Sequence, residues 1–113
     1  MKINKELVKG SIVILILNML EREPMYGYKL IKEIEKNSGG IFSFKEGTLY
    51  PILHSLEAEA MVEGFWTEEE GTRKRKYYRL VAKGHQYSKE KQAEWVTFRS
   101  AVDKVLGEGI VCR

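Results

Sequence analysis

Apolar residues recur with a helical period over the first part of the chain. Within residues 5–23, an i, i+4, i+7 stripe comprises Val13, Leu17 and Leu20. The run IVILIL at 12–17 makes the middle of this segment apolar on nearly every side, and Pro24 ends it. The pattern predicts a helix over 5–23 that is buried on two faces, although a short buried strand would carry the same apolar run.

Two more helical patterns follow. The first predicts a helix over 25–40 whose apolar stripe is formed by Tyr26, Leu30 and Ile34, and Gly39 and Gly40 end it. The second predicts a short helix over about 47–60, with core positions Leu49, Ile52, Leu53 and Leu56. Pro51 is compatible with this helix if the helix begins near Thr48, because a first-turn residue needs no N–H donor.

The pattern changes after residue 60. Over 61–81, two short runs rich in Val, Phe, Trp and Tyr flank a polar tip that contains Gly71, which predicts a β-hairpin. From 82 to about 107 no proline interrupts the chain, and a heptad-like stripe is formed by Trp95, Phe98, Val102 and Val105. We therefore expect a mainly α (α+β) protein with little sheet and one long C-terminal helix.

Composition limits the class of protein. The chain has 113 residues, of which 43% are hydrophobic and 31% charged, with a net charge of +3. These values are typical of a folded domain with a single core. The apolar run at 12–17 is far shorter than the roughly 20 residues of a membrane span. The single cysteine, Cys112, excludes an internal disulfide. We expect a cytoplasmic protein with no membrane partner.

Catalysis has no support in the sequence. His54 and His85 fall in separate predicted elements, and no nucleophile triad, glycine-rich phosphate loop or metal-ligand spacing is present. The acidic run 68–70 could chelate a cation, but three glutamates at a hairpin tip are more typical of a solvated loop. We expect no enzyme activity, no cofactor and no metal.

The hairpin concentrates positive charge on its second strand. The candidate phosphate-binding residues are Arg73, Lys74, Arg75 and Lys76. Alternation along a strand sends odd and even positions to opposite sides, yet at an exposed tip all four could reach DNA. The competing interpretation is a solubilising loop that is balanced by the acidic run 68–70.

The third predicted helix offers the second half of a DNA-binding site. Groups of a size suited to a DNA groove lie near its N-terminal end, namely Lys45, Thr48, Tyr50, His54 and Ser55. Glu57 and Glu59 would repel a DNA backbone, so only the N-terminal end is expected to approach DNA. Tyr50 could equally be a core aromatic residue.

Three helices followed by a hairpin with a basic tip form the winged helix-turn-helix arrangement. The sequences GTLYPILHSLE at 47–57 and RKYYRLVAKG at 75–84 resemble the PadR family of bacterial transcriptional regulators. The segment YGYKLIKEI at 26–34 is similar to the second helix of that family. The resemblance covers about 10–106, and the single C-terminal helix is similar to the shorter subfamily.

The resemblance implies a homodimeric repressor. The third helix would enter the major groove, the wing would touch the minor groove or its phosphates, and two half-sites would form a roughly palindromic operator. By position, Thr48, Leu49, Tyr50 and Pro51 match the TLYP motif of the family, and 75–78 match its RKYY motif. The resemblance implies that Leu49 belongs to the DNA-binding residues together with Thr48 and Tyr50. Many members have a basic residue in place of Ser55, and many have threonine in place of Val81. Loss of a threonine cap costs about 1 kcal/mol.

The resemblance also implies a division into a DNA-binding domain at 1–81 and a dimerisation helix and tail at 82–113. The expected dimer interface or ligand pocket consists of Leu7, Ile14, Trp95, Phe98, Val102 and Val105. Some relatives bind flat aromatic or apolar compounds near such an interface, where Trp95 and Phe98 could stack on one, although plain packing also explains them. We expect a sequence-specific DNA-binding regulator, a repressor released by a small ligand or another signal. The alternative is a winged-helix protein-interaction module that does not bind DNA.

Overall fold

The computed structural model describes residues 4, 8–68 and 73–107. Within them, the element order is α2 (Ile12–Arg22), β1 (Met25–Tyr26), α3 (Gly27–Asn37), α4 (Glu46–Ala58), β2 (Val62–Glu68), β3 (Lys74–Leu80) and α5 (Ala82–Leu106). The predicted α+β class with its winged helix-turn-helix arrangement is confirmed. The predictions for Leu7, Gly71 and Cys112 fall outside the described residues.

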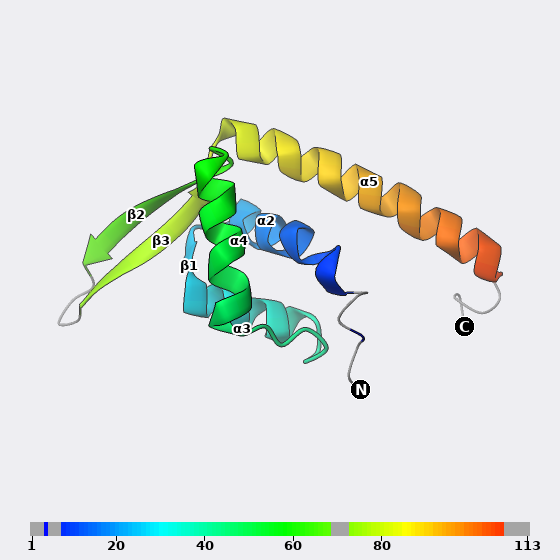
Figure 1. The fold of residues 1–113 in the computed structure, drawn as a ribbon, viewed down its shortest axis with the longest axis horizontal. Coiled ribbons are helices and arrows are strands. Elements are labelled where there is room, and N and C mark those ends of the chain that lie inside the picture. Colours follow the sequence, from blue (N-terminus) through cyan, green and yellow to red (C-terminus); the bar gives the residue numbers. More distant parts are fainter. Residues whose placement is uncertain (1–3, 5–7, 69–72, 108–113) are drawn as a thin grey trace.

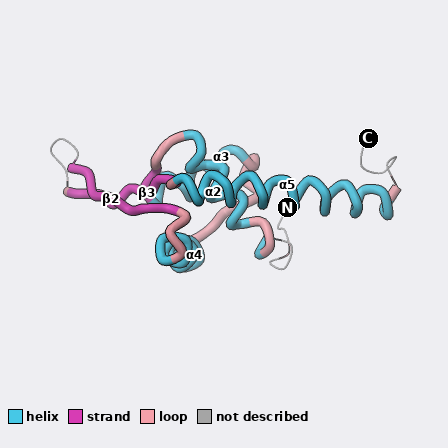
Figure 2. Tube along the Cα trace, turned by 90° about the horizontal axis from the view of Figure 1, so that it is seen from above, coloured by secondary structure: helices cyan, strands magenta, loops and turns pink. Residues whose placement is uncertain are grey.

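The body of the protein consists of α2, α3 and α4, from which two elements project at opposite ends (Figure 1). One is the wing, formed by β2 and β3, and the other is the C-terminal half of α5. The view from above shows the same elongated arrangement (Figure 2), and the principal extents are 54 × 31 × 21 Å. The wing and the end of α5 are therefore separated by the length of the molecule.

The apolar run at 12–17 is helical, so the strand alternative is wrong. The predicted helix is nevertheless interrupted, because Gly10 and Ser11 form a turn in which the Ser11 Oγ donates to the Val8 carbonyl at 2.9 Å. Glycine is the weakest helix former after proline, which explains a break at this point. The continuous helix α2 begins at Ile12.

The second helix begins later than predicted because Met25 and Tyr26 form a strand. This strand, β1, pairs with β3 in antiparallel register, Met25 with Tyr78 and Tyr26 with Tyr77. The sheet order is β1-β3-β2, so three strands form the sheet where the sequence predicted two. Helix α3 ends at Asn37, and the positive φ angles of Gly39 and Gly40 turn the chain away from the helix axis.

Helix α4 spans Glu46–Ala58, close to the predicted 47–60, but it begins before Thr48, the start that would have placed Pro51 in the first turn. Pro51 therefore lies in the second turn, where its ring nitrogen cannot donate to the Gly47 carbonyl. At the other end, the Lys83 ammonium donates to the Glu59 carbonyl at 2.9 Å and so satisfies a backbone acceptor at the helix C-terminus.

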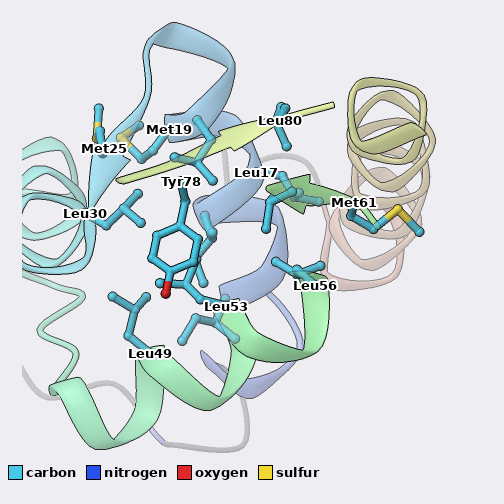
Figure 3. Packing of buried hydrophobic residues seen from close by; sticks show 14 of the residues in the cluster. Leu17, Met19, Met25, Leu30, Leu49, Leu53, Leu56, Met61, Tyr78 and Leu80 are labelled. Atoms are coloured by element: carbon cyan, nitrogen blue, oxygen red, sulfur yellow. The ribbon is translucent and has the colours of Figure 1, made fainter. Parts of the chain in front are cut away.

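The core lies between α2, α3, α4 and the sheet. The Tyr78 ring lies among leucines from three of these elements (Figure 3), and the completely inaccessible aliphatic side chains are Ile16, Leu17, Leu30, Leu49 and Leu53. Of the four residues predicted to form the core face of α4, Leu49, Leu53 and Leu56 are buried, and Ile52 is half-buried against the core. The same burial shows that the Leu49 side chain cannot contact DNA, so its place among the expected DNA-binding residues is wrong.

Helix α5 is attached to the body through its first half. Buried Ser88 donates to Glu21 of α2, and Gln92 Nε2 donates to the same carboxylate at 3.2 Å. A Cβ at Gly84 would lie 1.9 Å from the Met61 carbonyl oxygen, so this position requires glycine for the close approach. Val81 occupies the N-cap and provides no side-chain hydrogen bond, as its identity predicts. None of the described helices combines the length and the apolar character of a membrane span.

Candidate nucleic-acid interface

The polar end of α4 and the basic strand of the wing meet at one groove of about 550 Å³. The predicted site residues that line it are Tyr50, His54, Arg73, Lys74, Arg75 and Lys76. These residues come from two elements that the sequence analysis treated separately. Among the residues that the structure describes, the groove is lined by four basic side chains and one acidic residue, Glu46, which suits a polyanionic partner.

Tyr50 packs against α3 and also lines the groove. A Cβ at Gly27 would lie 2.3 Å from the Tyr50 hydroxyl oxygen, so the ring lies directly on the first turn of α3. Burial raises the pKa of Tyr50, and the Glu46 carboxylate raises it further. The ring centroid is 6.2 Å from that of His54, which is exposed. Tyr50 thus joins α4 to α3 and also lines the groove.

The remaining α4 candidates are solvent-accessible. Thr48 and Ser55 are exposed on the helix, and Lys45 is exposed at its N-cap. None of these three belongs to the groove lining, whose α4 members Glu46, Tyr50 and His54 are spaced four residues apart along another side of the helix. Ser55 has a hydroxyl at the position where the family pattern suggested a cation, whereas Lys45 provides a positive charge at the N-cap.

The four basic wing residues divide into two kinds. Arg73 and Lys74 are exposed. The Arg75 guanidinium lies 4.5 Å from the centroid of the Tyr26 ring, a cation–π geometry, and the Lys76 Nζ lies 3.2 Å from Glu57 Oε1. Arg75 and Lys76 are therefore engaged within the protein, whereas the sequence treated all four as equivalent.

Two exposed aromatic residues in the groove were not predicted from the sequence. Trp66 of β2 is 66% exposed and pairs across the strands with Lys76, and Tyr28 of α3 is 52% exposed. The signal for Trp66 was strand alternation: Phe65 and Trp66 must face opposite sides of the sheet. Which of them faces the groove depends on the hairpin register, Trp66 opposite Lys76, and the sequence did not define that register.

The profile of the PadR-like transcriptional regulator family matches residues 16–90 of the chain. The chain belongs to this family. A transcriptional regulator from Clostridium thermocellum has a similar structure, with 29% identity, a TM-score of 0.84, and coverage of 91% of this chain and 100% of the other. A PadR family regulator from Eggerthella lenta is 37% identical, with a TM-score of 0.77 and coverage of 89% and 86%.

A further relative is an uncharacterized protein of Lysinibacillus sphaericus, 29% identical over 108 residues that cover 96% of this chain and 98% of the relative. The PadR-like protein is therefore a DNA-binding transcriptional regulator with a winged-helix fold. Its family is one of transcriptional regulators and not a class of enzymes.

The apolar stripe of α5 in the PadR-like protein is accessible in the single chain. Exposed fractions are 40% for Trp95, 61% for Phe98, 38% for Val102 and 87% for Val105. The interpretation that this stripe packs wholly within its own domain is therefore wrong. The Trp95 and Phe98 rings are stacked, with centroids 6.0 Å apart and planes at 29°. Ile14 on α2 is half-buried.

Proposed function

We propose that this PadR-like protein is a cytoplasmic repressor that binds a roughly palindromic operator as a homodimer. The observation that supports the proposal is the shared groove, in which the polar end of α4 and the basic wing face the same space. The N-terminal half of α4 enters the major groove, and Arg73 and Lys74 neutralise phosphates beside it. The proposed DNA-binding residues are Lys45, Thr48, Tyr50, His54, Ser55, Arg73, Lys74 and Arg75.

The proposed dimer uses residues 82–113 as the dimerisation unit and residues 1–81 as the DNA-binding unit. The exposed α5 stripe supports it, because four apolar side chains at heptad-like spacing are accessible to a second copy. Such a dimer presents two α4 helices to half-sites about 34 Å apart, one turn of DNA. Sedimentation at several concentrations tests the stoichiometry, and a protomer that stays monomeric at micromolar concentration contradicts it.

Release of the operator by a flat aromatic or apolar compound forms the second part of the proposal. The stacked and exposed rings of Trp95 and Phe98 offer a platform for such a ligand near the dimer axis. A ligand between the two copies changes the spacing of the α4 helices and thereby lowers operator affinity. Titration of candidate compounds tests this by tryptophan fluorescence. Unchanged emission from an intact dimer contradicts it.

Footprinting and transcription in vitro test the repressor directly. We expect protection of two half-sites in the DNA upstream of the gene, together with a fall in transcription as protein is added. Replacing Arg73 and Lys74 by alanine should weaken binding to every sequence, whereas His54→Ala should change the preferred sequence. Protein that protects no DNA at low salt supports the protein-interaction module instead.

A further inference from the structure

Glu57 connects the last turn of α4 to both strands of the wing. Its Oε2 accepts a hydrogen bond from the Gly64 backbone N–H on β2, with an N···O distance of 3.1 Å. Its Oε1 accepts from the Lys76 ammonium on β3, at 3.2 Å. A single carboxylate therefore holds the helix that faces DNA and the two strands that stand beside it.

The local sequence is fitted to this contact. Gly64 belongs to β2, the edge strand of the sheet, so an acceptor outside the sheet can reach its amide. A Cβ at Gly64 would lie 2.3 Å from Lys76 Cε and 2.8 Å from Glu57 Oε2. The end of the Lys76 side chain thus occupies the space above Gly64, and a side chain at position 64 would displace it from Glu57.

Lys76 carries a positive charge at neutral pH. The hydrogen bond that Lys76 donates to Glu57 raises the pKa of Lys76, so this side chain remains protonated. The Lys76 Nζ also lies 5.3 Å from the centroid of the Tyr78 ring in the core. A phosphate bound at Lys76 would lie close to the Glu57 carboxylate, whose negative charge would repel it.

We propose that Glu57 is a positioning residue for DNA binding, which fixes the wing relative to α4 through Gly64 and Lys76. Lys76 serves this internal contact and does not neutralise a phosphate, unlike exposed Lys74. The inference rests on the proposed use of α4 and the wing together at the operator. It also reverses the expectation from the sequence, in which Glu57 only repelled DNA and Lys76 was a phosphate ligand.

Charge-matched variants separate positioning from phosphate binding. The double variant Glu57→Gln/Lys76→Met keeps the size of both side chains and the net charge of the chain. We expect the slope of log affinity against log salt to equal that of the wild type. Lys74→Met, the matched loss of one exposed lysine per protomer, should make the slope shallower by about 1.8 per dimer, since each phosphate contact contributes about 0.9. An equal loss of slope in the double variant overturns the inference.

Single glutamate variants test the direction of the effect. Removing a negative charge near DNA raises affinity by simple electrostatics, yet we expect Glu57→Ala to lower operator affinity about tenfold. Glu59→Ala removes the same charge from the same end of α4, where the side chain is exposed, and should not lower affinity. The operator affinity of Glu57→Gln should lie between those of Glu57→Ala and the wild type, because the amide oxygen of glutamine still accepts the hydrogen bond from Gly64.

Higher affinity of Glu57→Ala overturns the positioning role. Far-UV circular dichroism shows which variants are folded. If Glu57→Ala is unfolded, Glu57→Gln and the double variant test the positioning role in its place. Failure of the wild type to bind any upstream DNA refutes the proposed function itself. If the wild type binds DNA but the double variant loses as much salt dependence as Lys74→Met, only the role of Glu57 and Lys76 is refuted.

Discussion

Phe98→Ala should weaken the proposed dimer while leaving the protomer folded. The Phe98 side chain is 61% exposed in the single chain. Complete burial of a side chain of this size contributes about 1.5–3 kcal/mol, so covering the exposed part contributes about 1–2 kcal/mol. A symmetric dimer contains the residue twice, which gives about 2–4 kcal/mol. Each step of about 1.4 kcal/mol corresponds to a factor of ten, so the dissociation constant of the dimer should increase by a factor of between about 30 and several hundred.

Val96→Ala provides the matched control for this measurement. Val96 is 54% exposed on the same helix but lies about 160° around it from Phe98. Sedimentation equilibrium over a concentration series gives the dissociation constant for each variant. Equal dissociation constants for Phe98→Ala and wild type refute the interface, as does an equal weakening by Val96→Ala.

Three further predictions concern stability. Val81→Thr should raise the free energy of unfolding by about 1 kcal/mol, because it supplies the missing cap of α5; urea unfolding measures this, and an unchanged midpoint contradicts it. Gly84→Ala should lower the free energy of unfolding by about 1–3 kcal/mol, because its Cβ would lie 1.9 Å from a backbone oxygen. Gly10→Ala is the control, because a Cβ at position 10 has no atom within 4 Å. Equal losses of stability in the two variants would contradict the explanation by close approach. Burial raises the pKa of Tyr78, and the Glu57 hydrogen bond raises that of Lys76. Both groups bind their protons more tightly in the folded than in the unfolded protein. The contribution of these groups to the free energy of unfolding should therefore be complete below about pH 10 and should decrease as the pH rises through their raised pKa values. Urea unfolding between pH 8 and 11 measures this, and a flat profile contradicts it.

The sequence predicted the helices well because each has a periodic apolar face. Leu49, Leu53 and Leu56 were assigned to the core from spacing alone and are buried. The short strand β1 was missed because its two residues continue the helical pattern. Only pairing with Tyr77 and Tyr78, far along the chain, makes an extended conformation favourable there.

The sequence predicted which elements form the candidate site but not which of their side chains contact one another. The sequence identified the basic strand and the polar end of α4, and the structure brings them to one groove. It did not show that Glu57 holds Lys76, since the two residues lie in different elements and their contact depends on where the wing stands on α4. It also left Trp66 and Phe65 equivalent, because only the hairpin register distinguishes their faces.

The salt dependence of operator binding tests the central claim most directly. Arg73 and Lys74 are exposed on the wing of each protomer, so a dimer offers at least four such cations. With about 0.9 per phosphate contact, the slope of log affinity against log salt for the upstream DNA should be about −3.6 or steeper. A flat slope, or absence of binding at low salt, would contradict the assignment of this groove to DNA.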